Sequence, residues 1–246
     1  MNPVIKNLVE HYSERSFLNK AIPDEVLDRI IETAYRAPTS VNSQQVSVIV
    51  SRDAEARKKI AELAGGQPWI AQAPVFLTLV LDMYKTQQGM ALNGEQQIAH
   101  NSVESLISGS TDVGIALASI MSAARSEGLG IVPIGGIRRD PEAIVHLLDL
   151  PEHTFPVAGV VIGYVDRPSE RKPRLPMQTF RHEESYQREG LENHIQHYND
   201  RLMQHWQSVG RGEGLNWSES MGAYYKNIYY PAVCPALLKQ GFKFDK

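Results

Sequence analysis

The stretch Gly114-Ile115-Ala116-Leu117-Ala118-Ser119-Ile120-Met121-Ser122-Ala123-Ala124 is small or apolar at every position. It forms the middle of a longer helical pattern over residues 101–127. Because no face of residues 114–124 carries a charge, the pattern predicts a helix that is buried on all sides, and its small residues permit close backbone approach. We therefore expect this helix to be the structural spine of the molecule.

Apolar runs on both sides of this helix predict buried strands. Residues 75–81 and 157–165 are nearly continuous apolar runs, which are typical of strands buried on both faces. Residues 46–50 and 131–136 predict two shorter strands, the second running into glycines. Helical patterns surround these strands, at residues 3–10, 23–34, 53–64, 140–148 and 191–207.

The remaining segments are polar and less regular. Residues 67–69 predict a tight turn, and residues 84–97 predict an irregular, mobile excursion. We find no internal repeat and no linker, so the sequence favours one interlocked α+β unit. We expect a single domain over residues 1–246, in which residues 187–246 form a C-terminal helical arm.

Composition excludes several classes of function. A formal net charge of -3 over 246 residues gives no electrostatic basis for binding nucleic acid or an anionic membrane. The single cysteine, Cys234, excludes a disulfide within the chain and a cysteine-based metal cluster. No apolar run approaches about 18 residues and no signal pattern opens the chain, so we expect a cytoplasmic protein.

Hydrogen-bond donors gather on loops beside the predicted buried elements. These loops are His11–Arg15, Ser40–Gln45, Gly65–Gln67, Pro133–Gly136 and Lys172–Arg174. Donors without an accompanying acid, base or metal set favour a bound organic anion over hydrolysis, and an arginine fork suits a phosphate. For the first loop the alternative interpretation is a polar helix end, and for the last it is a solvated basic loop.

Other common chemistries lack their sequence context. Gly128-Leu129-Gly130 follows a helix and precedes a strand, the reverse of a dinucleotide-binding motif. No Gly-x-Ser-x-Gly elbow is present, and Cys234 has no nearby histidine. His194 and His197 share a helix face without a third ligand, so we predict no metal site.

Several short motifs occur together in one order along the chain. They are His11-x-Ser13-x-Arg15-x-Phe17, Ala37-Pro38-Thr39-Ser40 with Gln45, Gly65-Gly66-Gln67-Pro68-Trp69, Gly128-Leu129-Gly130-x-x-Pro133-Ile134-Gly135-Gly136, Lys172-Pro173-Arg174-Leu175-Pro176, Tyr229-Tyr230-Pro231 and Lys239-Gln240-Gly241-Phe242. In this combination the chain resembles the nitroreductase superfamily, and within it the NADPH-dependent FMN nitro and flavin reductases.

The resemblance implies an α+β nitroreductase-like fold with a mixed central sheet, an intertwined homodimer, and FMN held non-covalently near the subunit interface. It assigns the FMN phosphate and ribityl chain to His11, Ser13, Arg15, Lys172 and Arg174. Ser40, Gln45 and Gln67 would bond the ring or ribityl chain, and Pro133, Ile134, Gly135 and Gly136 would face the ring edge. Tyr12 stands where the family usually has arginine, and we expect it to donate one hydrogen bond instead.

The resemblance also implies the mechanism. FMN would take hydride from NADPH, or from NADH, and pass electrons in ping-pong fashion to nitroaromatics, quinones or free flavins, with no catalytic side chain. Asn42 and Ser43 would face this acceptor. Arg211 would bind the extra phosphate of NADPH. Its segment has fewer basic residues than the corresponding segment of relatives that prefer NADPH.

Two alternative functions stay open at this stage. A protein that stores or senses FMN with little turnover would fit the sparse basic residues near Arg211. A non-flavin interaction protein would fit the aromatic tail over residues 216–240, which carries Tyr224, Tyr225, Tyr229 and Tyr230.

Overall fold

The structure, a computed structural model, describes residues 1–245 and divides into two compact units. The first unit comprises Met1–Ser169 together with the residues from Tyr230 onward, and the second comprises Glu170–Tyr229. The second unit thus begins before residue 187, and the chain returns to the first unit at Tyr230. A single domain with an arm over residues 187–246 stays a prediction.

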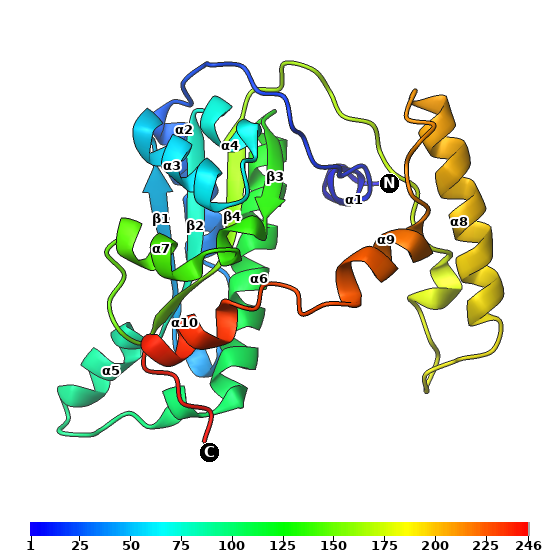
Figure 1. Ribbon diagram of the computed structural model, residues 1–246. Coiled ribbons are helices and arrows are strands. Elements are labelled where there is room, and N and C mark those ends of the chain that lie inside the picture. The colour runs from blue at the N-terminus through cyan, green and yellow to red at the C-terminus, as the bar shows by residue number, and fades with distance from the viewer. Residues whose placement is uncertain (246) are drawn as a thin grey trace. The chain divides into compact units, whose positions relative to one another are not determined.

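The first unit is built on a four-stranded sheet (Figure 1). Its strands are β1 (Val46–Ser51), β2 (Val75–Asp82), β3 (Gly130–Ile134) and β4 (Thr154–Gly163), in the order β1-β2-β4-β3. The α+β class is confirmed, but the expected mixed sheet is wrong for residues 1–245, because all three pairings are antiparallel. β2 and β3 do run in the same direction, but β4 lies between them and separates the parallel pair.

Helices cover both faces of this sheet. The helices of the first unit are α1 (Pro3–Val9), α2 (Asp24–Tyr35), α3 (Ala54–Leu63), α4 (Pro68–Gln72), α5 (Met83–Ala91), α6 (Val103–Ser126), α7 (Pro141–Leu147) and α10 (Val233–Lys239), with short 3-10 turns at Ser40–Asn42, Ala99–Asn101 and Gly136–Arg138. One core cluster packs α2 and α6 against Leu77 and its face of the sheet. A second packs α3, α4 and α7 against Phe76 and the opposite face. Both faces are therefore covered, which explains the continuous apolar runs.

The predicted helix ends are confirmed. Asp53 and Asp140 cap α3 and α7, each accepting a hydrogen bond from the backbone N–H three residues later. Helix α3 ends before Gly65, whose φ of 92° is a left-handed conformation that glycine adopts without steric cost. These local signals fix where the polar loops begin.

Helix α6 is buried along one stripe only, so the prediction of burial on all sides is wrong for the single chain. The stripe is Ser105, Gly109, Asp112, Val113, Ala116, Ile120 and Ala124. Ile107 and Ile115 lie on exposed faces. The sheet and α2 contact just one side of the helix, which leaves its remaining apolar surface uncovered. By length and composition, α6 is also the one helix within residues 1–245 that is long and apolar enough to cross a membrane.

Two predicted irregular segments are helical instead. Residues 83–91 form α5, where Asp82 caps the first turn and Thr86 bonds the buried Gln97. Gln97 in turn donates to the Met83 carbonyl at 3.0 Å. Residues 68–72 form α4, because Pro68 at its first position already has a helical φ. The prediction of an irregular segment is therefore wrong for residues 84–91, whereas residues 92–97 have no regular secondary structure.

The second unit is mainly helical, as predicted for residues 191–207. It contains α8 (Leu191–Ser208), α9 (Trp217–Tyr225) and a 3-10 turn at Met177–Thr179. Asn199 and Ser218 exchange two hydrogen bonds, at 2.9 and 3.1 Å, and thereby join α8 to α9. The Tyr198 hydroxyl donates to the Pro173 carbonyl at 3.0 Å, which ties the Lys172–Arg174 segment to α8.

Candidate active site

The segment His11–Phe17 lies along the β3–β4 side of the sheet. The backbone N–H of Glu14 donates to the Ile131 carbonyl at 2.9 Å, and Phe17 pairs with Val165 and is buried. Burial of Glu14 and Phe17 leaves Arg15 exposed, and its guanidinium carbon lies 5.6 Å from the centre of the Trp69 ring. The sequence prediction that this stretch presents donors on a loop is consistent with this placement.

A glycine contact joins the next two loops. The Gln67 side chain donates to the Ala64 carbonyl at 2.9 Å. A Cβ added at Gly136 would lie 2.5 Å from both the Ala64 oxygen and the Gln67 side-chain nitrogen. Only glycine therefore fits at residue 136. Residues 11–15, 64–69 and 133–136 form one neighbourhood, which we call the β3-side cluster.

The loop of residues 39–45 has a different construction. Val41, Asn42 and Gln44 all have positive φ, of 47°, 56° and 51°. Such conformations are costly for residues other than glycine and persist only where surrounding contacts hold them. The Thr39 hydroxyl accepts from the Gln44 backbone N–H at 3.0 Å and provides one such contact. We call residues 39–45 the β1-side loop.

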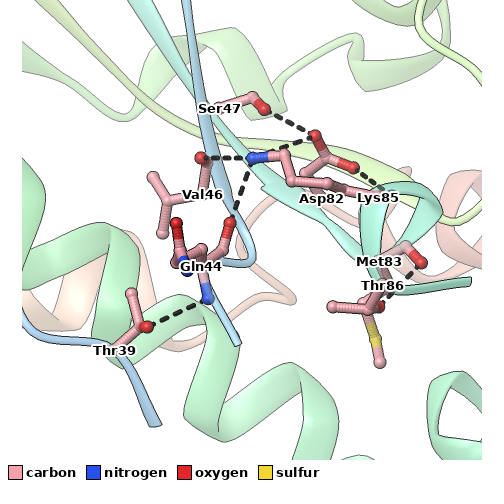
Figure 2. A network of polar contacts seen from close by, with 8 residues as sticks. All are labelled: Thr39, Gln44, Val46, Ser47, Asp82, Met83, Lys85 and Thr86. Carbon is pink, nitrogen blue, oxygen red and sulfur yellow. Dashed lines mark hydrogen bonds and ion pairs between the residues drawn. The ribbon is translucent and has the colours of Figure 1, made fainter. Parts of the chain in front are cut away.

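Two charged residues from elsewhere in the chain hold the β1-side loop. Lys85 on α5 donates to the Gln44 and Val46 carbonyls at 3.0 and 3.1 Å, and Asp82 accepts from the Lys85 backbone and from Ser47 (Figure 2). On the other side, the buried Asp112 of α6 accepts from the Ser40 backbone and from the Gln45 side chain. The loop is thus anchored to two helices.

The β1-side loop and the β3-side cluster do not meet within one chain. They adjoin β1 and β3, the two edge strands, which are separated by β2 and β4. Three inter-strand spacings amount to about 14 Å. The loop is also held by α6, on the sheet face opposite α3 and α4. Ser40, Asn42, Ser43 and Gln45 are therefore placed apart from Arg15, Gln67 and Pro133–Gly136.

The second unit brings two of the predicted cations together. The Lys172 ammonium lies 5.0 Å from the centre of the Trp206 ring, and the Arg211 guanidinium carbon lies 6.0 Å from the same ring. The Trp206 N–H donates to the Leu215 carbonyl at 3.0 Å, which fixes the indole. It stays a prediction that Lys172 and Arg174 bind the same phosphate as Arg15. The roles assigned to His11, Tyr12 and Ser13 also stay predictions.

Sequence reasoning missed three residues that organise these sites, namely Asp112, Lys85 and Trp206. Asp112 had a detectable signal, because it is the one acid between Glu104 and Glu127 and comes directly before the apolar stretch 114–124. A buried carboxylate requires partners. Lys85 gave no signal, since its two carbonyl partners lie about forty residues earlier in the chain. Trp206 lies within the helical pattern of residues 191–207, which gives it no separate signal.

The polar inventory suits an aromatic ligand that carries a phosphate. Trp69 Nε1 and Ser43 Oγ are buried and have no hydrogen-bond partner within residues 1–245. Arginine, histidine and serine donors suit a phosphate, and the missing Cβ at Gly136 permits close backbone approach by a flat ring. No group of three metal-ligating side chains occurs in the described part of the chain. The donor set is consistent with the predicted site for a phosphorylated aromatic cofactor, which stays a prediction.

Comparison with known proteins identifies the family. Residues 8–164 match the Nitroreductase family, and residues 172–245 match the Nitroreductase family C-terminal domain. The FMN reductase [NAD(P)H] of Bacillus subtilis is 44% identical over all of both chains, and the NADPH-flavin oxidoreductase of Vibrio harveyi is 32% identical over 98% of each. The chain therefore belongs to the nitroreductase family, as its motifs predict.

Solved structures show the same fold. NfrA2 of B. megaterium superposes with a TM-score of 0.97 at 44% identity, and all of both chains is covered. The NADPH:FMN oxidoreductase of Vibrio harveyi, complexed with NAD+, superposes with a TM-score of 0.87 at 32% identity, covering 98% of this chain and 99% of that one. The predicted nitroreductase-like fold is thereby confirmed.

Proposed function

We propose that the chain is an FMN-dependent NAD(P)H oxidoreductase that reduces a small aromatic or quinone acceptor. The relatives' activities and the family confirm the predicted class of enzyme and its cofactor. The observation that supports the site is the contact of Gly136 with Gln67 and Ala64, which brings a side-chain amide and a backbone edge without a Cβ to one place.

The chain's own residues bind and orient the cofactor. Arg15, Ser13 and His11 hold the phosphate, with Tyr12 adding a donor and Lys172 and Arg174 completing its charge neutralisation. FMN, when bound, supplies the hydride acceptor and the electron store. Gln67 and the backbone of Pro133, Ile134, Gly135 and Gly136 would lie at the ring edge, where the N–H groups of Ile134, Gly135 and Gly136 would favour negative charge on the ring.

The acceptor binds beside the β1-side loop. Ser43 and Asn42 are assigned to the acceptor from the resemblance to the family, and the Ser43 hydroxyl has no partner within residues 1–245. Asn42 is exposed on the same loop. Bound FMN would serve donor and acceptor in turn at one place, so we expect ping-pong kinetics.

The second unit selects the electron donor. The Arg211 guanidinium carbon lies 6.0 Å from the centre of the Trp206 ring, and Arg211 is the residue that would bind the additional phosphate of NADPH. Arg211→Ala should raise KM for NADPH by about tenfold and leave KM for NADH unchanged, since a hydrogen bond to a charged group contributes about 1.5–3 kcal/mol. Equal changes for both donors would contradict this assignment. Steady-state kinetics with NADPH and with NADH give the two KM values.

A homodimer would complete the site. Helix α1 buries none of its residues, although Val4 and Leu8 are apolar. A groove of about 980 Å³ lies between α1 and the uncovered face of α6, lined by Val4 and Ile115 among others. A second copy covering this surface would also bring its β1-side loop to the β3-side cluster. Ile115→Lys should shift the mass measured by light scattering from dimer to monomer, and an unchanged dimer would contradict the interface.

Anaerobic reduction tests the proposed function. The purified protein should be yellow and should bleach when NADPH or NADH is added, and Arg15→Ala should lose its flavin on dialysis. A protein that stays yellow with both donors would contradict the enzyme and favour FMN storage or sensing. A colourless protein that takes up no FMN would favour the interaction protein. A cytoplasmic location stays a prediction.

A further inference from the structure

A pocket of about 470 Å³ lies on the first unit, and its lining includes none of the residues assigned to FMN, to the electron donor or to the acceptor. Four segments form it: residues 16–19, the first turn of α3, the last turn of α4, and residues 166–167. Sites for small organic molecules have volumes of about 300–1,000 Å³. The pocket is therefore large enough for such a molecule, and the proposed function does not use it.

Arg57 of α3 lines this pocket as a buried cation with few partners. Its side chain is only 7% exposed, and Nε is buried with no partner within residues 1–245. In the same part of the chain, the one hydrogen bond of the guanidinium runs from Nη1 to the Arg52 carbonyl. A guanidinium carries five N–H donors. The protein itself therefore satisfies only a small part of them.

The acids near Arg57 do not neutralise its charge. Burial lowers the pKa of the Arg57 guanidinium, and the negative charge of Asp53, which caps α3, offsets this only in part. Asp166 in the pocket wall is already engaged, because it accepts from the Ser16 hydroxyl at 3.0 Å and pairs with Arg167 at 3.5 Å. The charged residues of the lining are two arginines and one aspartate, which leaves a net charge of +1.

We propose that this pocket binds a small organic anion, whose carboxylate or phosphate group pairs with Arg57. The planar fork of a guanidinium matches both groups. The bond from Nη1 to the Arg52 carbonyl holds this fork in place before a ligand arrives. Phe17, Ala54 and Ala71 add apolar contacts for the organic part of the ligand. The inference goes beyond the proposed function and does not rest on it.

Three variants test the assignment. Arg57→Met removes the charge and keeps an unbranched apolar side chain, a replacement that buried ionic sites tolerate. Lys58→Met is the matched control, because Lys58 is the next residue of α3, loses the same charge and is exposed outside the lining. Gln72→Glu places a carboxylate in the pocket wall at an exposed position and leaves Arg57 unchanged.

The measurement is isothermal titration calorimetry of the purified protein with saturating FMN, at constant ionic strength. The probes are glycerol 3-phosphate, butyrate and uncharged glycerol. The wild type and Lys58→Met should bind one of the two anions at a single site and should not bind glycerol. The tighter anion identifies the head group. Arg57→Met should weaken binding at least tenfold, since hydrogen bonds to a charged group are lost. Gln72→Glu should weaken it about fivefold by repulsion between like charges.

Arg15→Ala separates this pocket from the predicted site of the FMN phosphate, and it should retain the anion. Loss of binding in Arg15→Ala together with full binding in Arg57→Met overturns the proposal, as does a wild type that binds neither anion. If Arg57→Met does not fold, Gln72→Glu decides, because unchanged affinity there overturns the location. A wild type that takes up no FMN would contradict the proposed function only, since the anion titration does not depend on flavin.

Discussion

The two polar regions of the first unit are built in opposite ways. The β3-side cluster depends on a missing side chain, because Gly136 leaves the space that the Ala64 carbonyl and the Gln67 amide fill. The β1-side loop depends on added side chains, because Asp112 and Lys85 reach into it from two helices. The shape of the β3-side cluster thus depends on an absent side chain, whereas the shape of the β1-side loop depends on hydrogen bonds that hold a strained backbone.

Filling the glycine space should have the largest effect. Gly136→Ala places a Cβ 2.5 Å from a backbone carbonyl that cannot rotate away, so we expect a loss of about 2–3 kcal/mol in the free energy of unfolding and loss of flavin. Gly135→Ala is the control, since its Cβ would meet the end of the Arg138 side chain, at 3.2 Å, rather than backbone. Urea denaturation measures both, and equal losses would contradict the comparison.

Removing a tether should have the next largest effect. Lys85→Met leaves the Gln44 and Val46 carbonyls without their ammonium donor, so we expect a loss of about 1–2 kcal/mol. Cleavage of the β1-side loop by a protease should also accelerate. Lys58→Met removes only an exposed contact of 4.0 Å to Glu55 and should change stability by less than about 0.5 kcal/mol. Resistance of the loop to proteolysis in Lys85→Met would mean that Lys85 is not a tether.

Lowering the pH should destabilise the histidine pair that packs beside α5, the helix that carries Lys85. His100 and His153 stack with ring centres 4.0 Å apart, and His153 contacts Gln87 of α5 at 3.0 Å. Burial, then the neighbouring His153 and Lys243, lower the pKa of His100 below its ordinary value of about 6.5. The unfolded chain therefore binds this proton more readily, so stability is complete above about pH 6.5 and falls as the pH drops through the interval down to the folded pKa.

Melting temperatures from pH 7.5 to 5 measure this dependence. His100→Asn is the comparison, because it removes the titrating ring from the stack. The melting temperature of the wild type should decrease more steeply with acid than that of the variant. Parallel curves for the two proteins would show that this histidine does not couple protonation to stability.

Relieving strain should give the smallest effect. Val41 is β-branched, has a φ of 47° and is 95% exposed, so Val41→Gly removes steric strain without losing packing. We expect a gain of up to about 1 kcal/mol, reduced by the greater freedom of glycine in the unfolded chain. Asn42→Gly should gain less, because asparagine tolerates left-handed backbone. Thermal unfolding measures both variants. A lower melting temperature for Val41→Gly than for Asn42→Gly would contradict the presence of strain at Val41.

The sequence predicts the glycine-built region better than the tethered one. Gly135, Gly136 and the Gly65–Gln67 turn are local motifs, and the strands beside them are continuous apolar runs. The contacts of Asp112 and Lys85 are non-local, so no local period or cap indicates them. The antiparallel insertion of β4 and the uncovered face of α6 likewise depend on which elements become neighbours in three dimensions.

The return of the chain to the first unit at Tyr230 has a consequence for synthesis on the ribosome. Leu237 and Phe242 are buried against Leu81 and Phe155, so they complete part of the first unit's core. They follow the whole of the second unit, Glu170–Tyr229, in the chain. A nascent chain that has already made every strand of the sheet therefore still exposes this apolar surface, and the first unit closes only after the second has been synthesised.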